Sequence, residues 1–276
     1  VVEAANDEDE VNLEDESGGL TDLLDTGDYT MSVSPTTTTG DATAALNDES
    51  DVASLVINDR STEEMVLWRT STDVRDDVVD VADDDGDDAA VTAITDGVES
   101  GVVTQTSEVA VGNPSDVLVH QISVTGLEGA LENQSGVNAR SLHTLLTTTH
   151  SADNNPDDEN VTSLTFEEQN PGSNVQPNDI DASALNQDQF ASAVDIVHDD
   201  ANGDYYVFLD LDTLTDVNSD IEDGDTYTVE FSVQEPLLTA ADQDDSEEDV
   251  EDAYESVSAD FDVVEADGDF NGDPVQ

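Results

Sequence analysis

The stretch AVDIVHDDANGDYYVFLDLD, residues 193–212, gives the clearest indication of the fold. Apolar residues flank a polar centre on both sides, and Asn202 and Gly203 within that centre both tolerate positive φ. A two-residue type I′ turn requires such residues, so the stretch predicts a β-hairpin that turns at Asn202-Gly203.

Alternating apolar and polar residues recur along the chain and predict further strands, because a strand with one buried face alternates with period two. The predicted strands are YTMSV (29–33), SLVIND (54–59), EMVLWRT (64–70), VLVHQISVTGL (117–127), TYTVEFSV (226–233) and YESVSADFDVV (254–264). Helical spacing is confined to DDAAVTAITDGV (87–98), NARSLHTLLTTTH (138–150) and a segment that ends near Val81.

These elements predict a mainly β protein, an Ig-like β-sandwich elaborated with one or two short helices. Residues 1–25 are acidic with scattered apolar positions, which fits either a solvated tail or a donor or edge strand. Residues 26–276 form the predicted sandwich domain. The sequence leaves open a division of this domain into two packed sub-domains, with a boundary near residues 112–160.

The charge of the chain indicates a halophilic protein. Seventy Asp and Glu residues stand against four Arg and no Lys, which gives a net charge of −66 over 276 residues. A folded chain with this much like charge needs a screening medium, and molar salt shortens the Debye length to about 3 Å. The charge disfavours binding to nucleic acid, which is held through Lys and Arg. No apolar run approaches the roughly 20 residues of a membrane span.

The residue types exclude several catalytic mechanisms. Without Cys and Lys, thiol, Schiff-base and P-loop chemistry are impossible, and neither a G-x-S-x-G elbow nor an H-E-x-x-H pair occurs. Pairs of carboxylates are expected by chance among 70 acids, so we predict no enzymatic activity. The four histidines, His120, His143, His150 and His198, lack evident partners and are interpreted as packed or solvent-facing side chains.

Three Asp-rich turns are candidate cation sites: DDDGDD (83–88), DDANGD (199–204) and DGDFNGD (267–273). Calcium takes six to eight oxygen ligands, which spaced Asp residues around a glycine can supply. The first turn predicts a site for Ca²⁺ or another divalent cation at Asp83, Asp85, Asp87 and Asp88. The alternative interpretation is that the Asp-rich turns belong to a generally acidic surface, around which Na⁺ and K⁺ accumulate diffusely. In that case the protein requires no cofactor.

Two sequons predict N-glycosylation, at Asn133 and at Asn160. Both lie in predicted polar loops, where glycans can be added. A third triplet, which begins at Asn113, is excluded by the proline at its second position. Chance sequons are expected in a chain rich in Asn, Ser and Thr, so these two support an exterior protein only weakly.

The order of six motifs adds a family resemblance that covers roughly residues 50–270. The motifs are NDRSTEEMVLWRTS (58–71), NPSDVLVHQISVTGLEGALE (113–132), FEEQNPGSNVQPNDID (166–181), NGDYYVFLDLD (202–212), DGDTYTVEFSV (223–233) and ESVSADFDVVEADGDF (255–270). In this order they resemble the β-rich domain of haloarchaeal cell-surface glycoproteins of the S-layer type. The resemblance implies an extracellular, cell-surface, structural or interaction domain without enzymatic activity.

Two functions of different classes remain open. The first is a structural subunit of a haloarchaeal surface assembly, an S-layer-like lattice or a surface filament, which forms a homo-oligomer or polymer in high salt and contacts other cell-surface proteins. The alternative is a secreted binding module, such as a viral spike or adhesin, that recognises a cell surface. An exposed aromatic cluster would favour the second, but the one tryptophan, Trp68, lies in a predicted strand.

Overall fold

The computed structural model describes the residue ranges 2–4, 11–15, 18–19, 27–33, 51–58, 60–112, 116–148, 162–171, 176–211, 213, 221–234 and 254–266. The chain divides into two compact units, residues 1–59 and residues 60–276. Each unit is considered by itself below.

The first unit contains two small antiparallel sheets. One has the order β1-β2-β3, formed by β1 (Val2–Ala4), β2 (Val11–Asp15) and β3 (Gly18–Gly19). The other pairs β4 (Gly27–Val33) with β5 (Asp51–Ile57). β4 and β5 confirm the strands predicted at 29–33 and 54–59. β1 to β3, in the region assigned to a tail or a donor strand, pair with one another.

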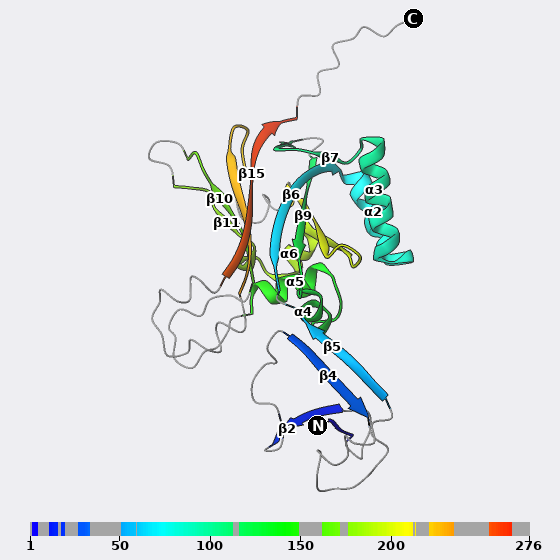
Figure 1. The fold of residues 1–276 in the computed structure, drawn as a ribbon. Coiled ribbons are helices and arrows are strands. Elements are labelled where there is room, and N and C mark those ends of the chain that lie inside the picture. The colour runs from blue at the N-terminus through cyan, green and yellow to red at the C-terminus, as the bar shows by residue number, and fades with distance from the viewer. Residues whose placement is uncertain are drawn as a thin grey trace, which may run out of the picture. The chain divides into compact units, whose positions relative to one another are not determined.

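The second unit is built on two five-stranded sheets (Figure 1). The first sheet has the order β12-β13-β9-β6-β7, with β6 at Thr62–Ser71, β7 at Thr104–Gln105, β9 at Asp116–Val124, β12 at Val194–Asp199 and β13 at Asp204–Asp210. The second sheet has the order β11-β10-β14-β15-β8, with β8 at Glu108–Val111, β10 at Thr162–Glu168, β11 at Ile180–Asp181, β14 at Thr226–Gln234 and β15 at Tyr254–Glu265. All pairs are antiparallel except β15 with β8.

The main core lies between these two sheets. Leu118 and Ile122 of β9 belong to the same buried apolar cluster as Phe166 of β10, Phe231 of β14 and Phe261 of β15. Phe261 stacks on Tyr227 and meets Phe166 edge to face. The predicted mainly β sandwich is therefore confirmed, and its core is formed by the alternate apolar residues that the sequence shows.

Two helices of 14 residues cover the outer face of the first sheet (Figure 1). Ser71 caps α2 (Thr72–Asp85), and Gly86, at φ +90°, separates it from α3 (Asp87–Ser100). A second apolar cluster joins both helices to β9, β12 and β13. β9 is consequently buried on both faces, and the unit contains more helix than the one or two short helices expected.

Three further short helices pack beside the strands. They are α4 (Glu128–Asn133), α5 (Ala139–Leu146) and α6 (Gln187–Ala193), with a 3₁₀ turn at Ala182–Ala184. The Asn138 side chain accepts a hydrogen bond from the Ser141 amide at 3.0 Å and so begins α5, as expected for an N-cap. The helix predicted within 138–150 is confirmed and ends at Leu146, before the threonine run.

The predicted hairpin is confirmed, but its turn is longer than expected. Pairing ends at Asp199 and Asp204, so four residues form the loop instead of two. The Asp199 carboxylate accepts hydrogen bonds from the amides of Ala201 (3.1 Å) and Asn202 (3.3 Å). Within the loop, φ is positive at Gly203 but not at Asn202.

The compact units of the chain divide after residue 59. The domain bounds expected from the sequence, after residue 25 and near residues 112–160, stay predictions. β8, which precedes residues 112–160, pairs with β15, which follows them, and β9, which lies within this range, pairs with β6 and β13. These pairings join described strands before, within and after that range into the same two sheets.

Candidate metal centre

The predicted cation ligands lie at a junction between two helices. Asp83 and Asp85 are exposed in the last turn of α2, and Asp87 and Asp88 are in the first turn of α3. Acidic residues at a helix N-terminus are favourable, whereas those at a C-terminus are not. Among the described residues, these four carboxylates do not form a cluster close enough to hold one metal ion. A site at Asp83, Asp85, Asp87 and Asp88 therefore stays a prediction.

A different set of side chains does converge. Glu128, His198 and Asp200 each offer a ligand atom, and these atoms all lie within 4.8 Å of one another. Glu128 is the first residue of α4, His198 lies near the end of β12, and Asp200 begins the hairpin loop. The pairing of β9 with β13 brings these parts together, because α4 follows directly after β9.

His198 is held rigidly in this group. It is 7% exposed, and its ring stacks on Tyr205, the residue opposite it in β13, with centroids 4.3 Å apart. Burial, together with the carboxylates of Glu128 and Asp200, raises the pKa of the Tyr205 hydroxyl above its usual range. Tyr205 therefore stays protonated beside the two acids, and the His198 ring is fixed in orientation by its stack.

Asp87 connects the predicted site with the observed one. Burial raises the pKa of its carboxyl above the usual range, while the backbone amide and the charge of His198 act in the opposite direction. The carboxylates of Asp88 and Glu132 add to the increase. The start of α3 thus lies close enough to His198 and α4 to enlarge the negative field around the group.

Sequence reasoning found part of this group and missed the rest. The Asp-rich turn 199–204 was a candidate for cations, and His198 lies next to it, but each was considered alone. Glu128 is 70 positions before His198 and is one of many acids. The third turn, 267–273, lies outside the described residues.

The other described histidines are packed, as predicted. His143 lies with its Nε2 2.8 Å from the Leu185 carbonyl oxygen and packs against Phe190. His120 is fully buried in the sandwich beside Phe166, and its ring nitrogens have no partner of good hydrogen-bond geometry in the described part of the chain. Burial lowers the pKa of His120 to about 4, which outweighs the opposing effect of the Val207 backbone.

The structure describes one of the two predicted glycosylation sites. Asn133 is the last residue of α4 and is exposed, so its side chain is accessible. Asn160 lies outside the described residues. Glycosylation at either position stays a prediction.

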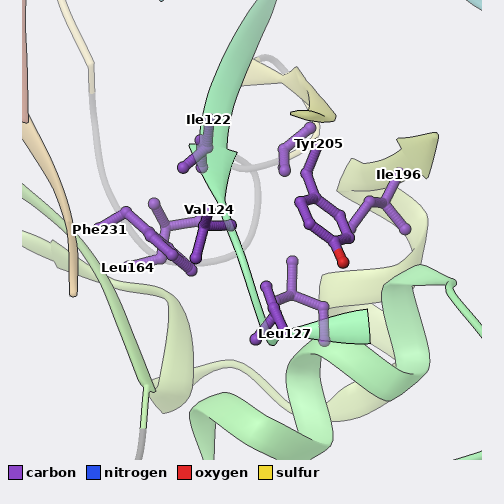
Figure 2. Close-up of a pocket in the computed structure, with 9 residues that line it drawn as sticks. Ile122, Val124, Leu127, Leu164, Ile196, Tyr205 and Phe231 are labelled. Carbon is purple, nitrogen blue, oxygen red and sulfur yellow. The ribbon is translucent and has the colours of Figure 1, made fainter. Parts of the chain in front are cut away.

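A small cavity lies beside Tyr205 within the sandwich core (Figure 2). It encloses about 10 Å³, and its lining is apolar, with side chains such as Ile122, Val124, Leu127 and Phe231. A water molecule in proteins needs two to four polar partners, which this lining does not offer. The cavity is a packing defect of the core and not a ligand site.

All four arginines are engaged in ion pairs within the chain. The pairs, with their closest N···O distances where given, are Arg60–Glu255 (3.5 Å), Arg69–Asp116 (3.9 Å), Arg75–Asp195 with Arg75–Asp210 (3.8 Å), and Arg140–Asp188 (2.9 Å). Each pair joins two different elements or the segments beside them. The scarce cations of the chain therefore cross-link its own fold.

Comparison with known proteins identifies relatives of nearly the whole chain. Over 269 residues it is 30% identical to the cell surface glycoprotein of Haloferax gibbonsii, a match that covers 93% of this chain and 24% of that protein. It is 29% identical over 263 residues to cell surface glycoprotein 2 of Haloarcula hispanica, covering 87% of this chain and 25% of that protein. The chain is a relative of the haloarchaeal cell surface glycoproteins.

Cell surface glycoprotein 1 of Haloarcula hispanica is also similar, with 28% identity over 229 residues, 79% of this chain and 22% of that protein. The chain thus spans about a quarter of the length of the curated cell surface glycoproteins it matches. No family model and no solved structure matches it. The relationship confirms the family predicted from the sequence and supports an extracellular, cell-surface location.

None of the helices in the described part of the chain is long and apolar enough to cross a membrane.

Proposed function

We propose that this chain is a structural domain of a haloarchaeal extracellular assembly, an S-layer-like lattice or a surface filament. In this function it has no enzymatic activity and associates with further copies of itself, and with other cell-surface proteins, in high salt. The names of its relatives support a structural role at the cell surface.

The observation that carries the proposal is that all four arginines form ion pairs within the chain itself. The chain has no Lys, and each Arg already pairs with a carboxylate of its own fold. A contact between two copies therefore places acid against acid. At molar ionic strength such repulsion is screened beyond about 3 Å, and divalent cations can bridge the remaining charges. Association is thus tied to the salt of the surroundings.

The outer face of the second sheet suits such a contact. α2 and α3 cover the other sheet (Figure 1), whereas the outward positions of β10, β14 and β15 carry polar side chains, such as Thr228, Glu230 and Asp260. Cross-strand hydrogen bonds hold exposed side chains of this face in place, from Thr226 to Asp262 at 2.7 Å and from Thr228 to Asp260 at 2.6 Å. A polar face whose side chains are held by cross-strand hydrogen bonds allows two copies to approach closely once the charge is screened.

The alternative function, a secreted module that recognises a cell surface, has less support. Trp68 is half-buried, packs against the apolar cluster under α2 and α3, and donates a hydrogen bond to the Gln121 side chain at 2.9 Å. The one tryptophan of the chain thus serves the fold and does not offer an exposed aromatic platform.

Sedimentation velocity and electron microscopy of the purified chain, in NaCl from tenth-molar to molar concentrations, test the proposal. We expect assemblies that form in molar NaCl and dissociate on dilution of the salt, and Ca²⁺ at constant ionic strength should lower the NaCl concentration that assembly needs. Ser258→Trp, on the outer face of β15, should block assembly, because a large side chain prevents close approach of the two sheets.

Thr95→Trp is the matched control, because it places the same side chain on the exposed face of α3. It should assemble like the original chain. A chain that stays monomeric in molar salt contradicts the proposed self-association, and equal assembly of the two Trp variants excludes the outer face of the second sheet as the contact.

A further inference from the structure

The group formed by Glu128, His198 and Asp200 has the composition of a metal centre. We propose that these three side chains bind one divalent transition-metal ion of the zinc class. The ion links α4 to the β12–β13 hairpin. This site is separate from the diffuse cation atmosphere of the acidic surface and does not depend on assembly.

The geometry is close to that of a coordinated ion. The three ligand atoms lie within 4.8 Å of one another. Ligands at about 2.0–2.2 Å around a tetrahedral ion lie roughly 3.4 Å apart, so small rotations of the two carboxylate side chains close the group. Both carboxylates are exposed and free to make these rotations, while the imidazole is fixed.

The state of His198 is an independent indication of a ligand. The residue is 7% exposed, its ring is stacked on Tyr205, and its ligand nitrogen lies within 4.8 Å of an oxygen of each carboxylate. Here the ring faces two carboxylates, and a bound cation would satisfy the imidazole and both acids together.

The donor set distinguishes between metals. Calcium and magnesium prefer oxygen ligands only, whereas an imidazole nitrogen suits zinc and neighbouring first-row ions. One His and two carboxylates leave at least one coordination position for water. The negative field of Asp87, which lies close to His198, favours a cation in this place.

Binding would add to the stability of the hairpin end of the sandwich. Metal affinity that exists only in the folded state becomes folding free energy. The ligands come from two segments that are far apart in sequence, so the ion would act as a cross-link between them. The stacked Tyr205 keeps the imidazole in position whether or not the ion is present.

The test is a titration of the purified, metal-free chain with Zn²⁺, followed by calorimetry, in molar sodium sulfate because chloride competes for zinc. We expect one equivalent to bind. Glu128→Gln and Asp200→Asn should each lower the affinity by at least about 100-fold, because loss of a second-shell partner alone costs 10–100-fold. Co²⁺ in place of Zn²⁺ should give a visible absorption band that His198→Phe abolishes.

Glu132→Gln is the matched control, because it removes the same charge from the same helix one turn further along. It should change the affinity by less than about 3-fold. His198→Phe keeps an aromatic ring stacked on Tyr205, so its circular dichroism spectrum separates lost binding from lost folding. Equal affinities of Glu128→Gln and Glu132→Gln, or displacement of Zn²⁺ by an equal concentration of Ca²⁺, would overturn the proposal.

Discussion

The two faces of the first sheet are held by different forces. Its inner face packs against the second sheet through a large apolar cluster. The ring of His120 is buried on this face and contacts Phe166. Its outer face meets α2 and α3 through a smaller cluster, and Arg75 of α2 pairs with Asp195 and Asp210 on the sheet. Apolar burial needs no salt. By contrast, α2 carries seven Asp residues and only one Arg, so the repulsion among its carboxylates must be screened. The inner face should therefore be the stable part and the outer face the salt-dependent part.

Removal of salt should have the largest effect. On transfer from molar to tenth-molar NaCl we expect the fold to be lost, with the helix-covered face lost at a higher salt concentration than the sandwich core. Trp68 fluorescence reports on the outer face, and near-ultraviolet circular dichroism of the buried Tyr205 and Tyr227 reports on the inner face.

Two results would change this interpretation. A spectrum that is unchanged at tenth-molar salt would contradict the halophilic character of the fold. Coincident transitions of the two signals would mean that both faces unfold as one cooperative unit. Sucrose in place of salt serves as the control, because it strengthens burial without screening charge.

Phe261→Ala should have the next largest effect. The side chain is 1% exposed and lies between Phe166 and Tyr227, so its loss should cost about 3–5 kcal/mol of unfolding free energy. Urea unfolding at two different NaCl concentrations in the molar range measures this loss of unfolding free energy. The loss should be the same at both concentrations. A loss that shrinks as salt rises would show that the inner face also depends on screening. Phe261→Leu, expected to cost less than about 1.5 kcal/mol, is available if the alanine variant does not fold.

The sheets could be predicted from the sequence, and the helical layer only in part. Strands such as β14 alternate strictly, so the residues that face the core can be read directly. β9 shows an apolar residue at nearly every position, and its burial on both faces follows from helices that lie far from it in the sequence. In α2 the valines are dispersed among seven Asp residues, so the sequence indicated little more than a helix end near Val81.

The candidate centre could not be assembled from the sequence for a similar reason. His198 and Asp200 are neighbours in the chain, but Glu128 meets them only because β9 pairs with β13 in one particular register. With 70 acids available, no composition rule selects Glu128. By contrast, Asp87 was a predicted cation ligand because it lies in the Asp-rich turn 83–88. Its surroundings nevertheless include His198 and Glu132, which come from other elements.

His120 should make the inner face sensitive to pH. Its pKa is lowered to about 4 in the fold, whereas an unfolded chain has the ordinary value of about 6.5. The unfolded state therefore takes up the proton first, and stability is lost as pH falls from 6.5 towards 4, by up to roughly 3 kcal/mol. Urea midpoints of the original chain and of His120→Leu at several pH values measure this loss.

The difference between the two chains isolates the histidine, because the carboxylates titrate in both. His120→Leu should be about 1–3 kcal/mol more stable at neutral pH, since it removes an unsatisfied polar group from the core. Its advantage should then grow as pH falls below 6.5. A constant difference across this range would show that His120 is protonated equally in the folded and unfolded chains.

Arg75→Met should have a smaller effect and should act on the outer face alone. The Arg75 side chain is 14% exposed, and its partners Asp195 and Asp210 are 24% and 17% exposed. Pairs this far buried lie between exposed pairs, worth at most about 1 kcal/mol, and fully buried ones, whose disruption costs 3–5, so we expect a loss of about 2 kcal/mol. The unfolding transition seen by Trp68 fluorescence should shift more than the tyrosine signal.

Arg140→Met provides the control that makes this comparison decisive. It removes an equal charge from an ion pair with Asp188 whose side chains are 55% and 85% exposed, and should cost no more than about 0.5 kcal/mol. The double variant Arg75→Met/Asp195→Asn should recover part of the loss, because much of it comes from the acid left unpaired. If Arg75→Met costs no more than Arg140→Met, α2 and α3 are held on the sheet by apolar packing, and the two faces differ only in the size of their clusters.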